Sequence, residues 1–145
     1  MKLTRIGGPT VLVELDGWHI LIDPTFDAPG RRYSFGWGTS SRKTLGPTVA
    51  ADDLGRIDLA LVSHDHHADN LDDAGRELLR SAGAVVTTAS GAGRMAQRMP
   101  LANLHGLRGV SACCCRAPGQ ACRPSRSRPR HAATDRRSVT PSSAM

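Results

Sequence analysis

The sequence predicts an α/β fold in which a sheet layer is covered by helices. Residues 3–22 show short apolar strands separated by turn residues, which is typical of a meander. Residues 57–100 then show a strand pattern and a helical pattern twice in alternation. A meander followed by this alternating order favours a helix-covered sheet. The chain of 145 residues is long enough for one modest core.

The first strands lie at residues 3–6 and 10–15 and are parted by two glycines and a proline. An Asp-Gly pair at residues 16–17 is a strong signal for a two-residue hairpin turn, and residues 18–22 form the returning strand. No period is sustained over residues 23–49, where Pro, Gly, Ser, Thr and aromatic residues predominate. We expect this long loop to be functional or disordered.

An apolar strand at residues 57–62 is expected to be buried. A helix is predicted over residues 71–80, with Asp69 or Asn70 as its N-cap. Gly83 follows as the residue that closes this helix.

Two further elements complete the ordered part of the chain. Residues 84–88 give another strand, and a helix that begins at Ser90 ends before Pro100, because a proline disfavours helical backbone in the residue before it. These elements define an N-terminal domain at residues 1–105. Residues 106–145 show no period and are rich in Arg, Pro, Ser, Ala and Cys, so we expect a disordered, low-complexity basic tail.

Charge and cysteine content divide the chain at the same point. Residues 1–105 hold 11 Lys+Arg against 12 Asp+Glu, whereas residues 106–145 hold 8 against 1. The excess positive charge is therefore a property of the tail alone. The four cysteines also lie in the tail, without the paired C-x-x-C spacing of a zinc finger, at Cys113, Cys114, Cys115 and Cys122. The cysteine-free N-terminal part gives no sign of a disulfide-stapled secreted domain.

The sequence also predicts a compartment. No apolar run is long enough to span a membrane, and the N-terminus leads directly into a strand pattern without a signal peptide. We therefore expect a cytoplasmic protein with no membrane partner. The oligomeric state is not indicated.

A cluster of histidines follows the strand at residues 57–62. Three of the six histidines of the chain fall within four positions, at His64, His66 and His67, beside two aspartates. Imidazole and carboxylate are the usual protein ligands of zinc and related metals. His64 and His66 are two residues apart, so extended backbone directs both rings to the same side. A metal site is the prediction, and a solvated polar turn is the alternative.

These residues resemble a known family. Residues 63–66, Ser-His-Asp-His, look like the start of the H-x-H-x-D-H metal motif of the metallo-β-lactamase fold. Residues 6–14 and 21–26 are similar to the opening of the ascorbate-6-phosphate lactonase-like branch. The resemblance covers about residues 1–105 and implies the N-terminal half of an αββα sandwich.

The motif departs from the family pattern by one residue. Read from its start, His64 and His66 fit, but Ala68 stands in place of the aspartate. Read from its end, residues 69–72 fit the family's D-H-L-D, with asparagine in place of its histidine. One extra residue reconciles the two halves. The resemblance then implies the metal ligands His64, His66, Asp69 and, as an alternative to Asn70, His67.

The chemistry that the resemblance implies is metal-assisted hydrolysis of a small-molecule ester, lactone or phosphodiester. Zinc or manganese would lower the pKa of a bound water from about 15.7 toward about 7. His64 and His66 would hold the ion, and Asp69 is the catalytic candidate, because it would orient the water or hold a second ion. Asp65 is expected to accept a hydrogen bond from a histidine ring. Asp23 resembles the family's Asp-Pro position near the site, with a strand-end turn as its alternative role.

Other candidates are weaker. Gly7 and Gly8 resemble a family Gly-His pair without its histidine and are assigned only to a tight turn. His105 and His131 are the downstream candidates for later ligands, although His105 also fits a surface position. The residues of the long loop that either contact an anionic substrate or are simply solvated are Arg31, Arg32, Tyr33, Phe35 and Trp37.

The tail admits three interpretations. It is a disordered extension, or an arm whose arginines bind nucleic acid, although it lacks interleaved aromatics for base stacking. We favour a third, in which it is a frameshifted reading of a gene that continues normally. One permitted set of codons for residues 123–145, read two nucleotides later, gives an alternating strand pattern and then a Thr-Pro-x-x-His-Gly element similar to the family's next metal segment.

Under the frameshift interpretation the chain is a truncated and inactive hydrolase. A sheet face made by Val11, Val13, Leu59, Leu61 and Val85 would then lack its apolar partner layer. The alternatives are a non-catalytic fragment and a basic nucleic-acid-associated protein that acts through the tail.

Overall fold

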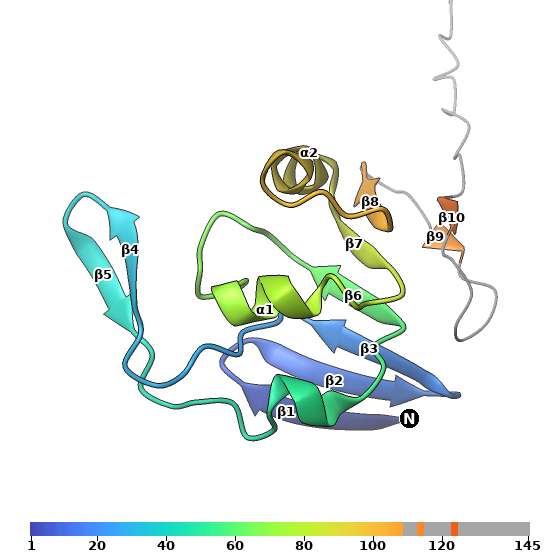
Figure 1. Cartoon of the computed structure of the whole chain (residues 1–145), viewed down its shortest axis with the longest axis horizontal. Helices are drawn as coiled ribbons and strands as arrows, with labels where there is room; N and C mark the ends of the chain where they lie inside the picture. Colours follow the sequence, from blue (N-terminus) through green and yellow to red (C-terminus); the bar gives the residue numbers. More distant parts are fainter. Residues whose placement is uncertain (109–112, 115–122, 125–145) are drawn as a thin grey trace, which may run out of the picture.

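A six-stranded mixed sheet forms the body of the computed structural model, which describes residues 1–108, 113–114 and 123–124 (Figure 1). Its strands are β1 (Lys2–Gly7), β2 (Thr10–Leu15), β3 (Trp18–Ile22), β6 (Leu59–Val62), β7 (Val85–Thr88) and β8 (Leu104–Leu107). The spatial order is β1-β2-β3-β6-β7-β8. The predicted α/β class is confirmed. The expected disorder of the tail concerns residues outside the described part, except for a short antiparallel pair of β9 (Cys113–Cys114) and β10 (Arg123–Pro124).

The sheet changes character at β3. Strands β1, β2 and β3 are antiparallel neighbours, whereas β3, β6, β7 and β8 run parallel. The turn between β2 and β3 has positive φ at both Asp16 (48°) and Gly17 (81°). Positive φ at both positions is what a two-residue hairpin turn with the natural strand twist requires, so the Asp-Gly prediction is confirmed.

Helices cover one face of this sheet. They are η1, a 3₁₀ turn (Ala51–Leu54), α1 (Asp73–Leu78) and α2 (Ala89–Arg98). A single buried cluster joins sheet residues such as Leu21, Val62 and Val85 to Leu54 and Met95 of the helical layer. The core therefore lies between the sheet and the helices.

The opposite face of the sheet is apolar and partly exposed. Strand register aligns Val11 with Ile22, Leu61 and then Val86 across four strands. The half-buried side chains of this open face are Val11, Val13, Ile20, Ile22, Leu59 and Leu61. The sequence prediction was wrong for Val85, because the alternation of β7 turns Val85 into the core and Val86 to the open face.

The long loop after β3 contains a hairpin that the sequence analysis did not predict. It consists of β4 (Arg32–Gly36) and β5 (Thr39–Arg42), and it projects from the body of the molecule in Figure 1. Trp37 and Gly38 at its tip both have positive φ. Strand β8 was also not predicted, and its four residues run through residue 105.

Helix α1 begins later than expected. Its N-cap is Asp72, whose side chain accepts a hydrogen bond from the backbone N–H of Gly75, so Asp69 and Asn70 are not the cap. The helix also lies very close to the segment after β3. A Cβ atom at Gly75 would lie 2.0 Å from the carbonyl oxygen of Pro24. Only glycine permits this approach.

We expect the substitution Gly75→Ala to lower the free energy of unfolding by about 1–3 kcal/mol or more, because backbone must move to relieve the collision. The matched control is Gly93→Ala on α2, where nothing lies within 4 Å of the added Cβ. That change should stabilise the helix by up to about 1 kcal/mol. Thermal unfolding followed by circular dichroism measures both, and equal melting temperatures for the two variants would contradict the packing described here.

Candidate functional site

The histidine motif lies at the carboxyl end of β6, in the loop that leads to α1. In parallel sheets, ligands commonly bind outside this end of the strands. Asp23 follows the neighbouring strand β3 and is buried, with a positive φ of 43°. Its carboxylate Oδ1 accepts a hydrogen bond from the backbone N–H of Ser63 (2.7 Å), and its own N–H donates to the carbonyl of Leu61 (2.9 Å). Asp23 therefore fixes the chain just before His64.

Three imidazole rings lie together on this loop. The ring centroids are 6.4 Å apart for His64 and His66, 5.9 Å for His64 and His67, and 6.5 Å for His66 and His67. Two imidazoles on one tetrahedral zinc have centroids roughly 5 Å apart, given Zn–N bonds of about 2.0–2.1 Å. Within the described ranges, no three His, Cys, Asp or Glu side chains are already arranged to hold a metal. The donor set fits zinc, and ligation requires the rings to move about 1 Å closer.

The residues beside the rings have separate roles. The side-chain nitrogen of Asn70 lies 3.0 Å from both ring nitrogens of His64, and the hydroxyl of Ser63 lies 2.9 Å from Nδ1. Asn70 thus contacts a predicted ligand. Asp69 is exposed and lines a neighbouring cleft.

The carboxylate of Asp65, expected to accept a hydrogen bond from a histidine ring, is engaged by an arginine. This buried carboxylate pairs with the guanidinium of Arg94 on α2, through Nε at 3.1 and 3.2 Å and through Nη2 at 2.5 Å. Burial by itself raises the pKa of Asp65, but the hydrogen bonds and charge of Arg94 outweigh it and hold that pKa below its ordinary value. This ion pair ties the motif loop to α2, and the distant Arg94 carried no signal in the sequence.

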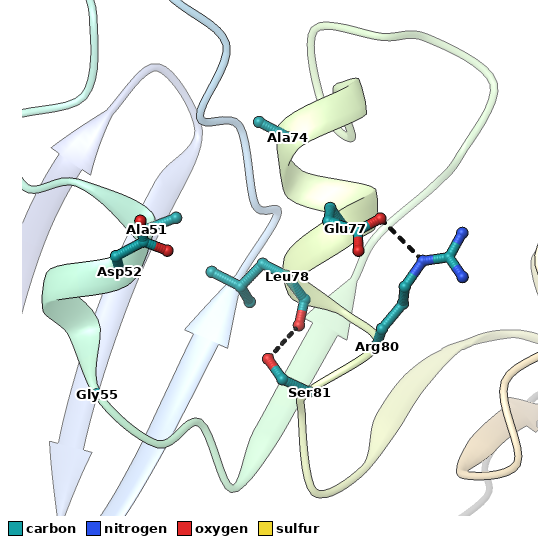
Figure 2. A pocket seen from close by; sticks show the side chains of 8 residues that line it. All are labelled: Ala51, Asp52, Gly55, Ala74, Glu77, Leu78, Arg80 and Ser81. Carbon is teal, nitrogen blue, oxygen red and sulfur yellow. Dashed lines mark hydrogen bonds and ion pairs between the residues drawn. The ribbon is translucent and has the colours of Figure 1, made fainter.

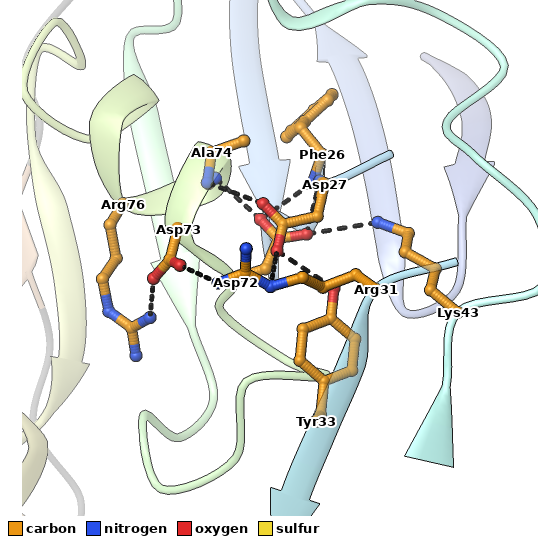
Figure 3. A network of polar contacts seen from close by, with 10 residues as sticks. Phe26, Asp27, Arg31, Tyr33, Lys43, Asp72, Asp73, Ala74 and Arg76 are labelled. Carbon is orange, nitrogen blue, oxygen red and sulfur yellow. Dashed lines mark hydrogen bonds and ion pairs between the residues drawn. The ribbon is translucent and has the colours of Figure 1, made fainter. Parts of the chain in front are cut away.

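A second buried carboxylate, Asp72, organises the far end of the loop (Figure 3). Its Oδ1 accepts from the backbone N–H groups of Phe26 (2.9 Å) and Gly75 (2.8 Å). Its Oδ2 accepts from the N–H of Asp27 (2.7 Å) and from Nζ of Lys43 (3.1 Å). One side chain therefore joins the segment after β3, the end of β5 and the start of α1. Sequence reasoning placed residue 72 inside the helix predicted over residues 71–80 and missed this role.

Asp27 extends the same network to the hairpin. It accepts hydrogen bonds from the N–H of Ala74 and the hydroxyl of Tyr33, and it pairs with Arg31. Burial, together with the nearby carboxylates of Asp27 and Asp72, raises the pKa of Tyr33 well above its ordinary value. Arg31 also pairs with Asp73 at 2.5 Å.

The remaining predicted residues are dispersed. Trp37 is fully exposed at the hairpin tip. Gly8 has a positive φ of 51°, which suits the expected turn. His105 is half-buried on β8 opposite Val86, and His131 lies outside the described residues. The side chain of Phe35 is likewise outside the described part.

Several hollows lie near these elements, and two of them are compared first. The larger, about 620 Å³, lies between η1 and α1 and is lined by Ala51, Leu78 and the ion pair of Glu77 with Arg80 (Figure 2). No residue of the histidine motif lines it. The other, about 420 Å³, lies between the hairpin and the motif loop and includes Asp69 and Asn70 in its wall. A hollow of about 170 Å³ has Asp65 in its lining, and one of about 380 Å³ has Ser63. The cleft of about 420 Å³ is the one that has the predicted site residue Asp69 together with Asn70 in its wall.

Comparison with known proteins supports the fold. No protein-family profile and no curated protein sequence matches the chain. Among solved structures, it is similar to the isothiocyanate hydrolase from Delia radicum gut bacteria (21% identity, TM-score 0.61), covering 74% of this chain and 42% of that one. It is also similar to a possible metal-dependent hydrolase from Veillonella parvula DSM 2008 (16% identity, TM-score 0.63, 76% and 43% covered). A third neighbour is the CmlA beta-hydroxylase E377D mutant (23% identity, TM-score 0.52, 77% and 22% covered).

These neighbours confirm a metallo-β-lactamase-type fold for the described part. The chain spans about two fifths of the length of the first two neighbours. In the described part, no helix is long and apolar enough to cross a membrane.

We expect Asp72→Asn to lower the free energy of unfolding by about 2–4 kcal/mol, because an amide cannot accept from three backbone N–H groups and also neutralise Lys43. The matched control is Asp73→Asn at the next position, where the carboxylate is mostly exposed and the cost should stay below about 1 kcal/mol. Urea unfolding of both variants tests the assignment. A similar loss in the two would show that Asp72 does not organise the loop.

Proposed function

We propose that this chain belongs to a metal-dependent hydrolase of the metallo-β-lactamase superfamily that acts on a small-molecule ester, lactone or phosphodiester. The observation that carries the proposal is the gathering of three histidine rings at the carboxyl end of β6 in a fold of this type. The similarity of residues 6–14 and 21–26 to the ascorbate-6-phosphate lactonase-like branch supports lactone as the first substrate class to test.

In this proposal each residue has a defined task. His64 and His66 would hold zinc or manganese, with His67 as a further ligand, and the chemistry that such an ion would supply is activation of water near neutral pH. Asp69 is exposed on the same loop and would orient the attacking water or hold a second ion. Asn70 holds the ring of His64 in place. Asp23 and the Asp65–Arg94 pair keep the loop in position from both sides.

We further propose that residues 1–105 are only part of the catalytic unit. The first two neighbours are more than twice as long as the matched segment, and the open face of the sheet is apolar. The frameshift interpretation of residues 106–145 would explain why, among the residues that the structure describes, no second layer covers that face. Under the same interpretation the chain would also lack the metal ligands that the family places further along the sequence.

We expect the full chain to bind zinc through the motif, so that the double change His64→Ala, His66→Ala abolishes binding. The cysteines should first be alkylated, because thiolates of the tail are strong zinc ligands in their own right. The control is His19→Ala on β3, whose Nδ1 lies 3.1 Å from the carbonyl of Arg56. Elemental analysis that finds equal zinc in the double variant and in the control would remove the ligand assignment.

We expect little or no metal-dependent hydrolysis of lactones, phosphodiesters or simple esters by the chain as it stands. Restoring the reading frame after about residue 105 should recover turnover, because it supplies ligands and an apolar layer for the open face. Turnover by the unaltered chain with added zinc would contradict the frameshift proposal and leave the hydrolase proposal intact. Turnover by neither protein would count against both.

A further inference from the structure

The cleft beside the motif carries an excess of positive charge. It lies between β1, the β4–β5 hairpin and the motif loop, and its lining includes the cations Arg5, Arg42 and Lys43. Asp69 is the acidic residue of the lining. Its volume of about 420 Å³ is within the range typical of small-molecule sites.

The three cations differ in whether they have a partner. Lys43 is held by the buried carboxylate of Asp72, so its charge is compensated within the protein. Neither Arg5 nor Arg42 forms an ion pair with any part of the chain that the structure describes. Two guanidinium groups therefore border a concave surface with their charge available to a ligand.

Strand register adds a second observation about the charge around Arg42. Arg32 and Arg42 are directly opposite each other across the hairpin. Like charges in this position destabilise a strand pair. An oxyanion bound at Arg42 would reduce this repulsion, and planar guanidinium groups suit the two-oxygen face of carboxylate and phosphate.

The cleft is also connected to the histidine motif. Asn70 lines the cleft, and its side-chain nitrogen contacts the ring of His64. A ligand whose oxyanion occupies the cleft would therefore place the rest of its structure next to the proposed metal ligands.

We propose that this cleft is an oxyanion-binding site in which Arg5 and Arg42 recognise a phosphate or carboxylate group. The substrate of the proposed hydrolase is then an anionic small molecule, and this reading rests on the proposed function. The binding site itself can be tested without metal.

The test is titration calorimetry of the full chain with inorganic phosphate, and separately with acetate, in buffer freed of metal on a chelating resin and held at constant ionic strength by sodium chloride. We expect saturable binding of at least one of the two anions, and the better one identifies the group recognised. Arg5→Gln and Arg42→Gln should each weaken binding about tenfold, since each removes one charge-assisted contact. The matched control is Arg98→Gln on α2, which is exposed and outside the cleft. It should bind as the unaltered protein does.

A second measurement avoids substitutions altogether. Phenylglyoxal modifies accessible arginines, and the better-binding anion should protect Arg5 and Arg42 in the unaltered chain while Arg98 reacts at the same rate. Absence of saturable binding, or equal protection of all three arginines, would overturn the site. Anion binding by a chain that fails to bind zinc would keep the cleft and reject the hydrolase. Zinc binding without anion binding would keep the hydrolase proposal and reject the oxyanion site in the cleft.

Discussion

The arrangement around the histidine motif depends on one buried carboxylate. Asp72 is fully buried, and such a charge is tolerated only when its oxygens are fully satisfied. Three backbone N–H groups and one ammonium meet that condition, and they come from segments as far apart in sequence as Phe26 and Gly75. The requirement of a single side chain therefore determines how the segment after β3, the hairpin and α1 meet.

Two further carboxylates extend this logic to the motif loop. Asp23 accepts a hydrogen bond from the backbone N–H of Ser63 at the start of the loop. Two residues after Ser63, Asp65 is paired with Arg94 of α2. The histidines between and after these anchors are left partly or fully exposed. A backbone held by these contacts, with accessible imidazoles, suits a site that takes up a ligand from solution, because preorganisation lowers the entropic cost of binding.

Local sequence patterns predicted much of the fold, whereas interactions between residues far apart in the sequence could not be predicted. The meander, the Asp-Gly turn and the strand that delivers His64 follow from alternation and turn chemistry, which act between neighbours. The β4–β5 hairpin was not predicted because its strands are mostly polar, and Tyr33 is the one buried side chain among those that the structure describes there. The cap at Asp72 and the pairing of Asp65 with Arg94 depend on which segments meet in space, so a carboxylate in the sequence gave no sign of its partner.

The change from antiparallel to parallel pairing at β3 has a consequence for the order of folding. Antiparallel neighbours such as Leu15 and Trp18 pair across a two-residue turn, whereas Ile20 must find Leu59 across most of the first half of the chain. Hairpins form within about 1–10 μs, but closing a long loop costs entropy before any contact compensates it. The β1–β3 meander and the β4–β5 hairpin can therefore form early and independently. The carboxyl edge that carries the histidines is assembled only when β6 joins β3, so the site exists only in the late stages of folding.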